Sequence, residues 1–283
     1  MDTPSRRRFL QLTTLGAVAS LSGVSEPMPR TAQGETASPC RASLKLGLAS
    51  YSLRKFDVDQ TLAMTKRVGL GYIALKDFHL PLDSSPGHIE EVARKVKQAG
   101  LVLYGGGVIY MKTEAQVLGA FEYAKIAGMT TIIGVPAHNL LPLVDRLVKQ
   151  YNIKLAIHNH GPGDKVYPTP EAAYEKIKNL DERIGLCNDI GHTRRAGVDP
   201  SVSLKKYADR LLDVHIKDVS EATAKGHGVE VGRGVIDIPK VLRTLIEIGY
   251  AGVVSFEYEK NADDPMPGLA ESVGYVRGVL ACL

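Results

Sequence analysis

The sequence has little excess charge of either sign. Among its 283 residues, 35 Lys and Arg stand against 31 Asp and Glu, which gives a formal charge of +4. Proteins that bind nucleic acid usually concentrate far more positive charge on one face, so this composition argues against that class. Apolar residues make up 44% of the chain, which excludes an acidic disordered chain. The length suits one large α/β domain or two smaller domains.

Cysteine is also scarce. The three cysteines, Cys40, Cys187 and Cys282, are odd in number and show no C-x-x-C spacing. A disulfide framework needs paired cysteines, and a zinc knuckle needs closely spaced ones. The sequence predicts neither, and the cysteines are left out of the predicted chemistry.

The chain lacks an apolar run long enough for a transmembrane helix, which needs roughly 20 residues. The short apolar stretch 12–24 follows Ser5-Arg6-Arg7-Arg8-Phe9-Leu10-Gln11. Consecutive arginines ahead of such a stretch are typical of a twin-arginine (Tat) export signal. We interpret residues 1–40 as this signal and a polar spacer, outside the folded domain. The chain is then expected in the periplasm or elsewhere outside the cytoplasm, without a stable membrane span. No clear A-x-A site is present, so cleavage of the signal stays open.

From residue 41 onward, short apolar runs with β propensity alternate with amphipathic helical patterns. Helices are expected to end at Gly71, Gly100, Gly128 and Gly249, because the left-handed residue after a helix costs least as glycine. Thr169 before Pro170 is a matching helix start. Eight strands are predicted: Lys45–Ser50, Tyr72–Lys76, Leu101–Tyr104, Thr130–Gly134, Lys154–His158, Ile184–Asp189, Leu212–Lys217 and Gly252–Glu257.

Alternating strands and helices close into a barrel or form an open doubly wound sheet. An open sheet that binds nucleotides usually carries a glycine-rich phosphate loop after its first strand, where this chain has Tyr51-Ser52-Leu53-Arg54. Gly105-Gly106-Gly107 lacks the G-x-G-x-x-G spacing and indicates a bulge or a close approach of backbones. The sequence therefore predicts that residues 41–283 form a single α/β domain, a (β/α)8 TIM barrel.

Potential metal ligands stand at the ends of four consecutive predicted strands. In a TIM barrel these ends meet at one rim, where the active site is built. A mixture of nitrogen and oxygen ligands favours Mn, Zn, Co or Fe over Mg. The sequence predicts one divalent metal held by His158, Asp189, His215 and Glu257.

Three motifs follow the last predicted strands: Cys187-Asn188-Asp189-Ile190-Gly191-His192, His215-Ile216-Lys217-Asp218 and Val231-Gly232-Arg233-Gly234. With them, the chain from Ala42 to Leu283 resembles the xylose isomerase-like TIM barrels grouped as sugar phosphate isomerases/epimerases. The resemblance implies that Asp189, His215 and Glu257 are metal ligands. It also implies that His192 and Lys217 contact substrate, and we place Tyr51 and Arg233 with them. Phe56, Phe78 and Tyr104 are further candidates for the wall of a sugar site.

The chain departs from that family at the fifth strand. Ketose epimerases of the family usually carry a glutamate there, and two glutamates share the proton transfers on opposite faces of the substrate. Here His158 replaces one of them, and a metal-bound imidazole is a poor base. We expect Glu257 to remove the proton beside the carbonyl, and His160, His192 or Lys76 to serve as the second catalytic group.

The predicted function is a divalent-metal-dependent isomerase or epimerase that forms a metal-stabilised enediolate of a keto sugar. A lyase or hydrolase that eliminates the aglycone of a 3-keto-glycoside through the same enolate is the first alternative. A non-catalytic sugar-binding barrel is the second. Cleavage of DNA, as by the distantly related endonuclease IV, is disfavoured because the loop 221–234 has no Asp-x-His pair.

The expected partner is a small-molecule sugar or glycoside, with no nucleic acid. Export and the absence of a visible phosphate cradle argue against a phosphorylated sugar. Dimers are common in the family, so the resemblance leaves a homodimer open.

Overall fold

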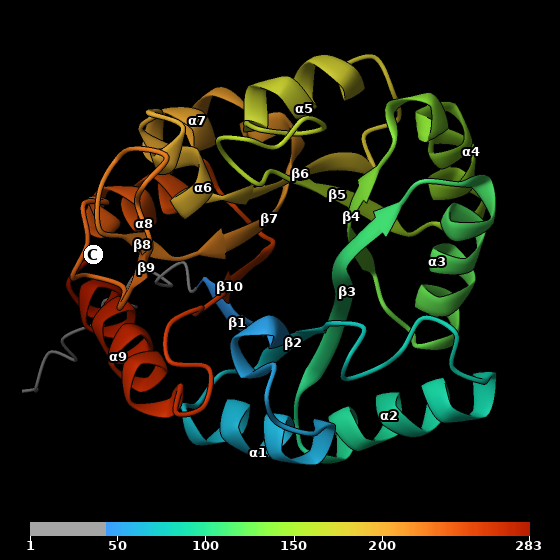
Figure 1. Cartoon of the computed structure of the whole chain (residues 1–283), viewed down its shortest axis with the longest axis horizontal. Helices are drawn as coiled ribbons and strands as arrows, with labels where there is room; N and C mark the ends of the chain where they lie inside the picture. The colour runs from blue at the N-terminus through green and yellow to red at the C-terminus, as the bar shows by residue number, and fades with distance from the viewer. Residues whose placement is uncertain (1–43) are drawn as a thin grey trace, which may run out of the picture. The chain divides into compact units, whose positions relative to one another are not determined.

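Eight parallel strands close into a barrel in the computed structural model, which describes residues 44–283 (Figure 1). Around the barrel the order is β1-β10-β7-β6-β5-β4-β3-β2, so the last strand pairs with the first. This closure confirms the predicted TIM barrel. The strands are β1 (Lys45–Ala49), β2 (Tyr72–Leu75), β3 (Val102–Met111), β4 (Thr131–Pro136), β5 (Lys154–His158), β6 (Ile184–Asp189), β7 (Leu211–Ile216) and β10 (Val253–Phe256).

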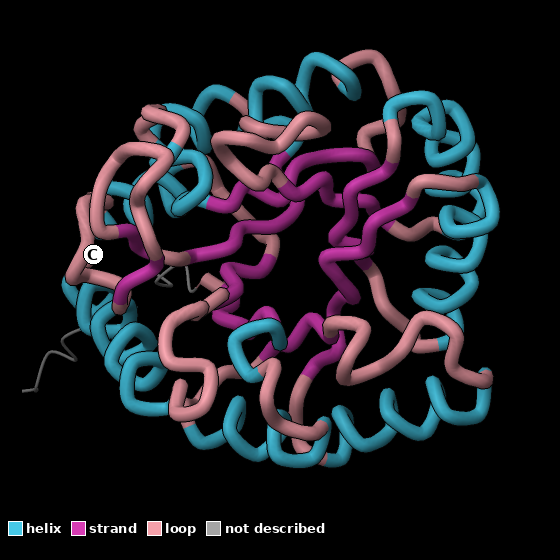
Figure 2. The backbone as a smooth tube through the Cα atoms, viewed as in Figure 1, coloured by secondary structure: helices cyan, strands magenta, loops and turns pink. Residues whose placement is uncertain are grey.

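Helices surround this inner ring of strands (Figure 2). Each helix buries one face against the strands, as in α2, whose Ile89, Val92 and Val96 are buried. The α-helices are α1 (Val58–Arg67), α2 (Pro86–Gln98), α3 (Glu114–Ile126), α4 (Leu141–Tyr151), α5 (Pro170–Ile177), α6 (Ile190–Arg195), α7 (Pro200–Lys206), α8 (Ile238–Glu247) and α9 (Met266–Cys282). Three short 3₁₀ turns, η1 (Ser50–Leu53), η2 (His138–Leu140) and η3 (Ala208–Arg210), complete the connections.

The predicted helix boundaries are largely confirmed. Thr169 caps α5 by accepting a hydrogen bond from the Ala172 N–H, with Pro170 in the first turn. Gly100, Gly128 and Gly249 have positive φ angles and end their helices. The prediction for Gly71 is wrong, because Gly69, with φ of 76°, is the left-handed residue after α1.

Strand β3 is longer than predicted. The three glycines lie inside it, and its pairing with β4 shifts register between Gly106 and Ile109. A Cβ at Gly107 would lie 2.2 Å from the Ile133 carbonyl oxygen, so the two backbones approach too closely for any side chain. The predicted bulge is confirmed, and the rim end of β3 is Met111 rather than Tyr104.

A small hairpin that the sequence did not predict projects from the loop after β7. Its strands, β8 (Asp218–Val219) and β9 (Gly228–Val229), pair antiparallel outside the barrel. Strands of two residues carry no hydrophobic period, so no sequence pattern reveals them. The hairpin adds a wall beside the rim.

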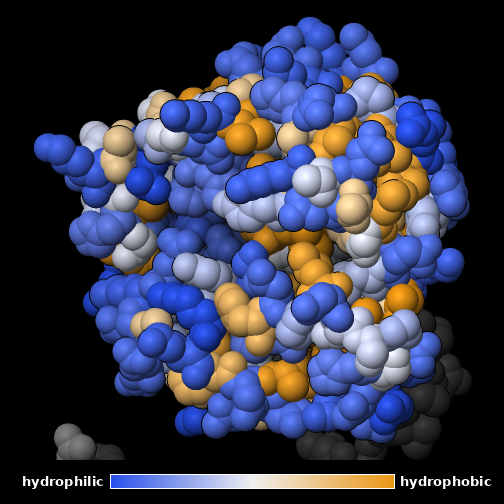
Figure 3. All heavy atoms as spheres, turned by 45° about the vertical axis from the view of Figure 1, so that its right-hand side comes forward, coloured by the Kyte–Doolittle hydropathy of each residue, from blue (hydrophilic) through white to orange (hydrophobic). Residues whose placement is uncertain are grey.

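On the face shown in Figure 3, hydrophilic residues dominate, with hydrophobic residues in patches between them. None of the helices in the described residues is long and apolar enough to cross a membrane. The proposed export signal and spacer fall outside the part of the chain that the structure describes.

Candidate metal centre

Four buried side chains from neighbouring strands converge at one end of the barrel. His158 ends β5, Asp189 ends β6, His215 belongs to β7, and Glu257 follows β10. His158 Nε2 lies 3.2 Å from His215 Nδ1 and 3.5 Å from Asp189 Oδ2, and Glu257 Oε2 lies 3.3 Å from His215 Nδ1. These four ligand atoms all lie within 4.8 Å of one another. We call these four residues the metal cluster.

The metal cluster fits a divalent ion. Ligands about 2.0–2.2 Å from a tetrahedral zinc lie roughly 3.3–3.6 Å apart, close to the separations found here. Asp189 Oδ1 accepts a hydrogen bond from the His192 N–H, whereas the buried Asp189 Oδ2 faces Lys217 Nζ at 2.9 Å and His158 Nε2 at 3.5 Å without a well-aligned hydrogen bond to either. A buried carboxylate oxygen whose hydrogen bonds are poorly aligned is costly, and an ion at the centre of the cluster would complete its contacts.

The histidines of the metal cluster are set up as ligands by their surroundings. Burial lowers the pKa of His158 to about 4, so its ring is neutral and keeps a lone pair. His215 Nε2 lies 3.5 Å from Asp213 Oδ2, which favours a proton on Nε2 and leaves Nδ1 free to bind. Burial raises the pKa of Asp213 to about 6. The thiol of Cys187 and the hydroxyl of Tyr104 both donate to that carboxylate.

Cys187 also lies near His158 and His215, but it is a poor third ligand. Complete burial raises the pKa of its thiol well above the usual range, so it stays protonated. Metal ions bind the thiolate. The set with two carboxylates is therefore the better candidate.

Lys217 is buried against the carboxylates of the metal cluster. Its Nζ lies 2.7 Å from Glu257 Oε2, 2.9 Å from Asp189 Oδ2 and 3.2 Å from Glu259 Oε1. Burial alone would lower the pKa of Lys217, but these carboxylates raise it well above the usual value. The same contact offsets the effect of burial on Glu257 and holds the pKa of Glu257 well below its usual range. Glu257 is therefore a carboxylate and Lys217 an ammonium.

A cavity of about 210 Å³ opens beside the metal cluster. It is smaller than the roughly 300–1,000 Å³ of pockets for drug-sized ligands, so it suits the reacting part of a small molecule. Six residues beyond the cluster ligands are predicted to contact substrate or serve in catalysis, and four of them, Tyr51, Lys76, His160 and His192, line the cavity. The full lining is Tyr51, Lys76, Val108, Tyr110, His158, His160, His192, Glu257 and Glu259.

His160 is held between two polar neighbours. Its Nε2 lies 2.9 Å from the Tyr110 hydroxyl, and Asp164 Oδ2 lies 3.1 Å from its Nδ1. Burial is the main cause that lowers the pKa of His160 and raises that of Tyr110. A neutral imidazole bonded to a protonated phenol results, at the wall of the cavity. Sequence reasoning missed Tyr110, because the three glycines were taken as the end of β3.

Lys76 enters the same cavity from the end of β2. Its ammonium donates to the Val108 carbonyl, lies 3.5 Å from Asp77 Oδ1 and sits 6.0 Å from the centre of the Tyr110 ring. Its backbone N–H donates to Ser50 Oγ, which fixes the turn after β2. Lys76 thus places a positive charge beside Tyr110 at the wall of the cavity.

Other predicted residues lie elsewhere. Arg233 is exposed and pairs with Glu271 of α9, so the structure does not bring it to the cavity. Tyr104 is buried inside the barrel, where its hydroxyl contacts Asp213 and Ser255. Phe78 is 44% exposed, and Phe56 lines a different groove.

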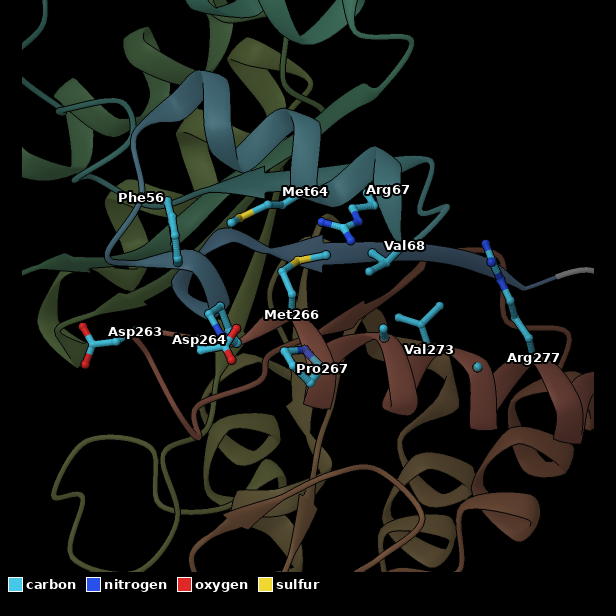
Figure 4. Close-up of a pocket in the computed structure, with 13 residues that line it drawn as sticks. Phe56, Met64, Arg67, Val68, Asp263, Asp264, Met266, Pro267, Val273 and Arg277 are labelled. Atoms are coloured by element: carbon cyan, nitrogen blue, oxygen red, sulfur yellow. The ribbon is translucent and has the colours of Figure 1, made fainter.

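That groove, of about 710 Å³, runs between α1 and α9 on the outside of the barrel (Figure 4). Met64 of α1 and Met266 of α9 lie in it together with Phe56. It contains no member of the metal cluster. Its size exceeds that of the cavity at the rim, but the groups suited to catalysis are at the rim.

Comparison with known proteins agrees with this architecture. The sequence model of the xylose isomerase-like TIM barrel family matches residues 62–278, and the chain belongs to this family. The family therefore confirms the class inferred from the fold and the rim residues.

Particular relatives share only parts of the sequence. The rhizopine catabolism protein MocC of Rhizobium meliloti is 27% identical over 151 residues, 48% of this chain and 46% of that protein. The inosose dehydratase of Clostridium tetani is 31% identical over 133 residues, 41% of this chain and 44% of that protein. The chain thus spans just under half the length of these curated relatives.

Solved structures share the fold over most of the chain. The 3-keto-D-glucoside 4-epimerase YcjR from E. coli superposes with a TM-score of 0.70 at 17% identity, covering 83% of this chain and all (100%) of that one. The IolI protein with a bound zinc atom superposes with a TM-score of 0.71 at 19% identity, covering 84% of this chain and 99% of that one. At these identities the likeness establishes the fold alone.

Proposed function

We propose that the chain is a divalent-metal-dependent enzyme that isomerises or epimerises a small keto sugar. The observation that carries the proposal is the metal cluster at the floor of a small cavity, with Glu257 on one side and His160 with Tyr110 on the cavity wall. A divalent ion held by His158, Asp189, His215 and Glu257 would supply a Lewis acid that polarises the substrate carbonyl.

The charge of the metal cluster suits an anionic intermediate. With His158 and His215 as neutral ligands and Asp189 and Glu257 as carboxylates, the metal cluster and the adjacent Lys217 ammonium together carry a formal charge of −1. A glutamate in place of His158 would make this charge −2. The centre is therefore one unit more positive than with the expected pair of glutamates, which favours negative charge developing on the sugar.

Proton transfer is assigned to groups on the cavity wall. Glu257, held as a carboxylate, removes the proton beside the carbonyl. The Tyr110 hydroxyl, which stays protonated and contacts His160 Nε2, returns a proton to the substrate. His160 orients that hydroxyl, and the Lys76 ammonium stabilises negative charge on a neighbouring oxygen.

A lyase is the second candidate. Elimination needs one base beside the carbonyl and one acid at the leaving oxygen. With His158 in place of the second glutamate, Glu257 remains as the base and Tyr110 as the acid. Inosose dehydratases of Clostridium tetani and Klebsiella pneumoniae are among the relatives, at 31% and 30% identity. On this proposal, Tyr110 would protonate the leaving group of a 3-keto-glycoside.

One experiment separates these functions. The full chain loaded with Mn²⁺ or Zn²⁺ is incubated in deuterated water with free ketoses and with 3-keto-glycosides. Deuterium beside the carbonyl without bond cleavage supports the isomerase or epimerase, and release of the aglycone supports the lyase. No reaction with any sugar, together with sugar binding, would instead support a non-catalytic barrel.

Variants test whether the metal cluster carries the reaction. Replacing Glu257 with Gln removes both a ligand and the base, so turnover and bound metal should both be lost. The control is Glu271→Gln, which removes the same charge from an exposed glutamate on α9. Turnover that survives Glu257→Gln unchanged would refute this mechanism.

A further inference from the structure

A second cavity, of about 390 Å³, lies next to the first and shares two of its walls, His192 and Glu259. The hairpin formed by β8 and β9 closes its outer side. Its remaining lining comes from α6 and from the loops after β7 and β10. The lining residues are His192, Arg195, Lys217, Val219, Gly226, His227, Gly228, Glu259 and Lys260.

The cations of this cavity differ in how they are neutralised. Lys260 pairs with Glu230 at 3.0 Å, and Lys217 pairs with the carboxylates described above. Arg195 has no carboxylate within 4.0 Å among residues 44–283. Its contacts are neutral: Nη2 donates to the Ala224 carbonyl at 2.9 Å, and Nη1 lies 3.2 Å from His192 Nδ1.

Arg195 is also incompletely bonded. Its Nε is buried and has no acceptor in the described part of the chain. A half-buried guanidinium whose partners are all neutral favours an anion that enters the cavity beside it. The loop of the hairpin holds Arg195, because Nη2 donates to the Ala224 carbonyl and Gly226 passes close to its Cγ.

Only one imidazole ring separates Arg195 from the metal cluster. His192 Nδ1 contacts the guanidinium, and His192 Nε2 lies 4.0 Å from Asp189 Oδ2. A sugar whose carbonyl lies at the metal cluster can therefore extend a group a few bonds away into the second cavity. In TIM barrels the loops after the seventh and eighth strands commonly form an anion site, and the same two loops supply walls here.

We propose that the second cavity is an anion subsite, in which Arg195 binds a carboxylate or phosphate group on the part of the substrate away from the reacting carbonyl. This inference rests on the proposed function, because it assigns the remainder of the same substrate. Sequence reasoning found no phosphate cradle because the walls come from four separate segments rather than one glycine-rich loop.

Binding to the metal-free chain tests the subsite without turnover. Calorimetric titrations use inorganic phosphate, D-glucuronate and uncharged D-glucose, each with the full chain after chelation. Phosphate or glucuronate should bind, and glucose should not. Binding of phosphate alone identifies a phosphate subsite, and binding of glucuronate alone identifies a carboxylate subsite.

Arg195→Gln should weaken the binding of the anion by about 10-fold or more, the range expected for a lost charged hydrogen bond. Arg194→Gln is the matched control, because it removes the same charge one residue away, outside the lining of the cavity. Arg195→Lys should restore part of the affinity, since it keeps the charge, and thermal unfolding of each variant checks that it is folded.

The outcomes also separate this inference from the proposed function. The subsite is overturned if neither anion binds, if glucose binds as well as glucuronate, or if the two glutamine variants weaken binding equally. Turnover of uncharged keto sugars by a chain that binds no anion would overturn the subsite and leave the proposed function standing. Anion binding without turnover of any keto sugar would overturn the proposed function alone.

Discussion

His158 is the residue that most alters the chemistry of the rim. Its side chain is almost fully buried, and burial lowers its pKa to about 4, so the ring is a neutral donor in the metal cluster. A glutamate there would add a further negative charge to the carboxylates of Asp189, Glu257 and Glu259 that already face Lys217. The imidazole therefore keeps a ligand at this position while removing a base.

Replacing His158 with Ala should weaken binding of Mn²⁺ or Zn²⁺ by more than about 100-fold. Removing a residue that only orients a metal ligand costs up to about 100-fold in affinity, and removing the ligand itself should cost more. The measurement is competition with a chelator, with bound metal determined by elemental analysis. The control is His138→Ala, because His138 is an exposed histidine outside the metal cluster, whose ring contacts the Val166 carbonyl and the ring of Tyr167. Equal metal affinity in the two variants would exclude His158 as a ligand.

At the scale of elements, His79 joins three segments near the rim. Its Nδ1 lies 2.8 Å from Ser50 Oγ in η1, and its Nε2 lies 2.9 Å from Thr61 Oγ1 in α1 and 3.0 Å from the Phe56 carbonyl. His79 itself lies in the turn after β2. A neutral ring with its proton on Nε2 satisfies these contacts, since it donates to the carbonyl and accepts from Ser50.

His79 should make stability depend on pH. Burial lowers its pKa below the ordinary value of 6.5, although the Phe56 and Leu53 carbonyls and Asp57 oppose the shift. Below about pH 6.5, the ring of His79 takes up a proton more readily in the unfolded chain than in the folded chain. The contribution of the neutral ring to the free energy of unfolding is therefore fully present above about pH 6.5 and is lost as pH falls. Denaturant unfolding at several pH values between 5 and 7 should show a shallower loss of stability for His79→Gln. Parallel profiles would show that His79 does not titrate on unfolding.

The contact between β6 and the start of β7 leaves no room at Gly185. A Cβ there would lie 2.2 Å from the Arg210 carbonyl oxygen and 2.6 Å from Leu212 Cγ. Gly185→Ala should therefore lower the free energy of unfolding by about 1–3 kcal/mol, as overpacking does. Chemical denaturation measures this change.

Gly119 provides the matched substitution. It lies inside α3, and a Cβ there would meet nothing within 4 Å. Gly119→Ala should raise the free energy of unfolding by about 0.5–1 kcal/mol, because alanine favours the helix. Destabilisation by both substitutions to a similar extent would contradict the packing described for β6.

The elements that could be predicted are those whose signals are local. Each barrel strand is a short apolar run, and His158, Asp189 and Glu257 stand at or just after the end of such a run. The sequence did not indicate Tyr110 as a site residue, because β3 continues past its glycines only through its pairing with β4. That pairing shifts register between Gly106 and Ile109, which no local pattern in β3 reveals. Arg233 was misplaced because Glu271, which holds it, comes 38 residues later in α9. Contacts between distant loops leave no pattern in either loop.

At the scale of the whole molecule, export remains a proposal based on Ser5 to Gln11. If these residues are a twin-arginine signal, replacing Arg6 and Arg7 with Lys should keep the chain in the cytoplasm, because the receptor reads the arginine pair. Cell fractionation of both forms, detected by a C-terminal tag, measures this. Replacing Arg30 with Lys, in the polar spacer, is the control. Recovery of the double variant outside the cytoplasm would contradict the proposal.

Closure of the barrel also determines when the metal ligands come together. Glu257 follows β10, the last strand of the barrel in chain order. Because β10 pairs with both β7 and β1, the barrel closes only when this strand is in place. A nascent chain on the ribosome holds His158, Asp189 and His215 well before Glu257 emerges. On the proposed function, ion loading is therefore a late event that follows synthesis of the barrel through Glu257. Any export of the loaded enzyme would have to wait for it.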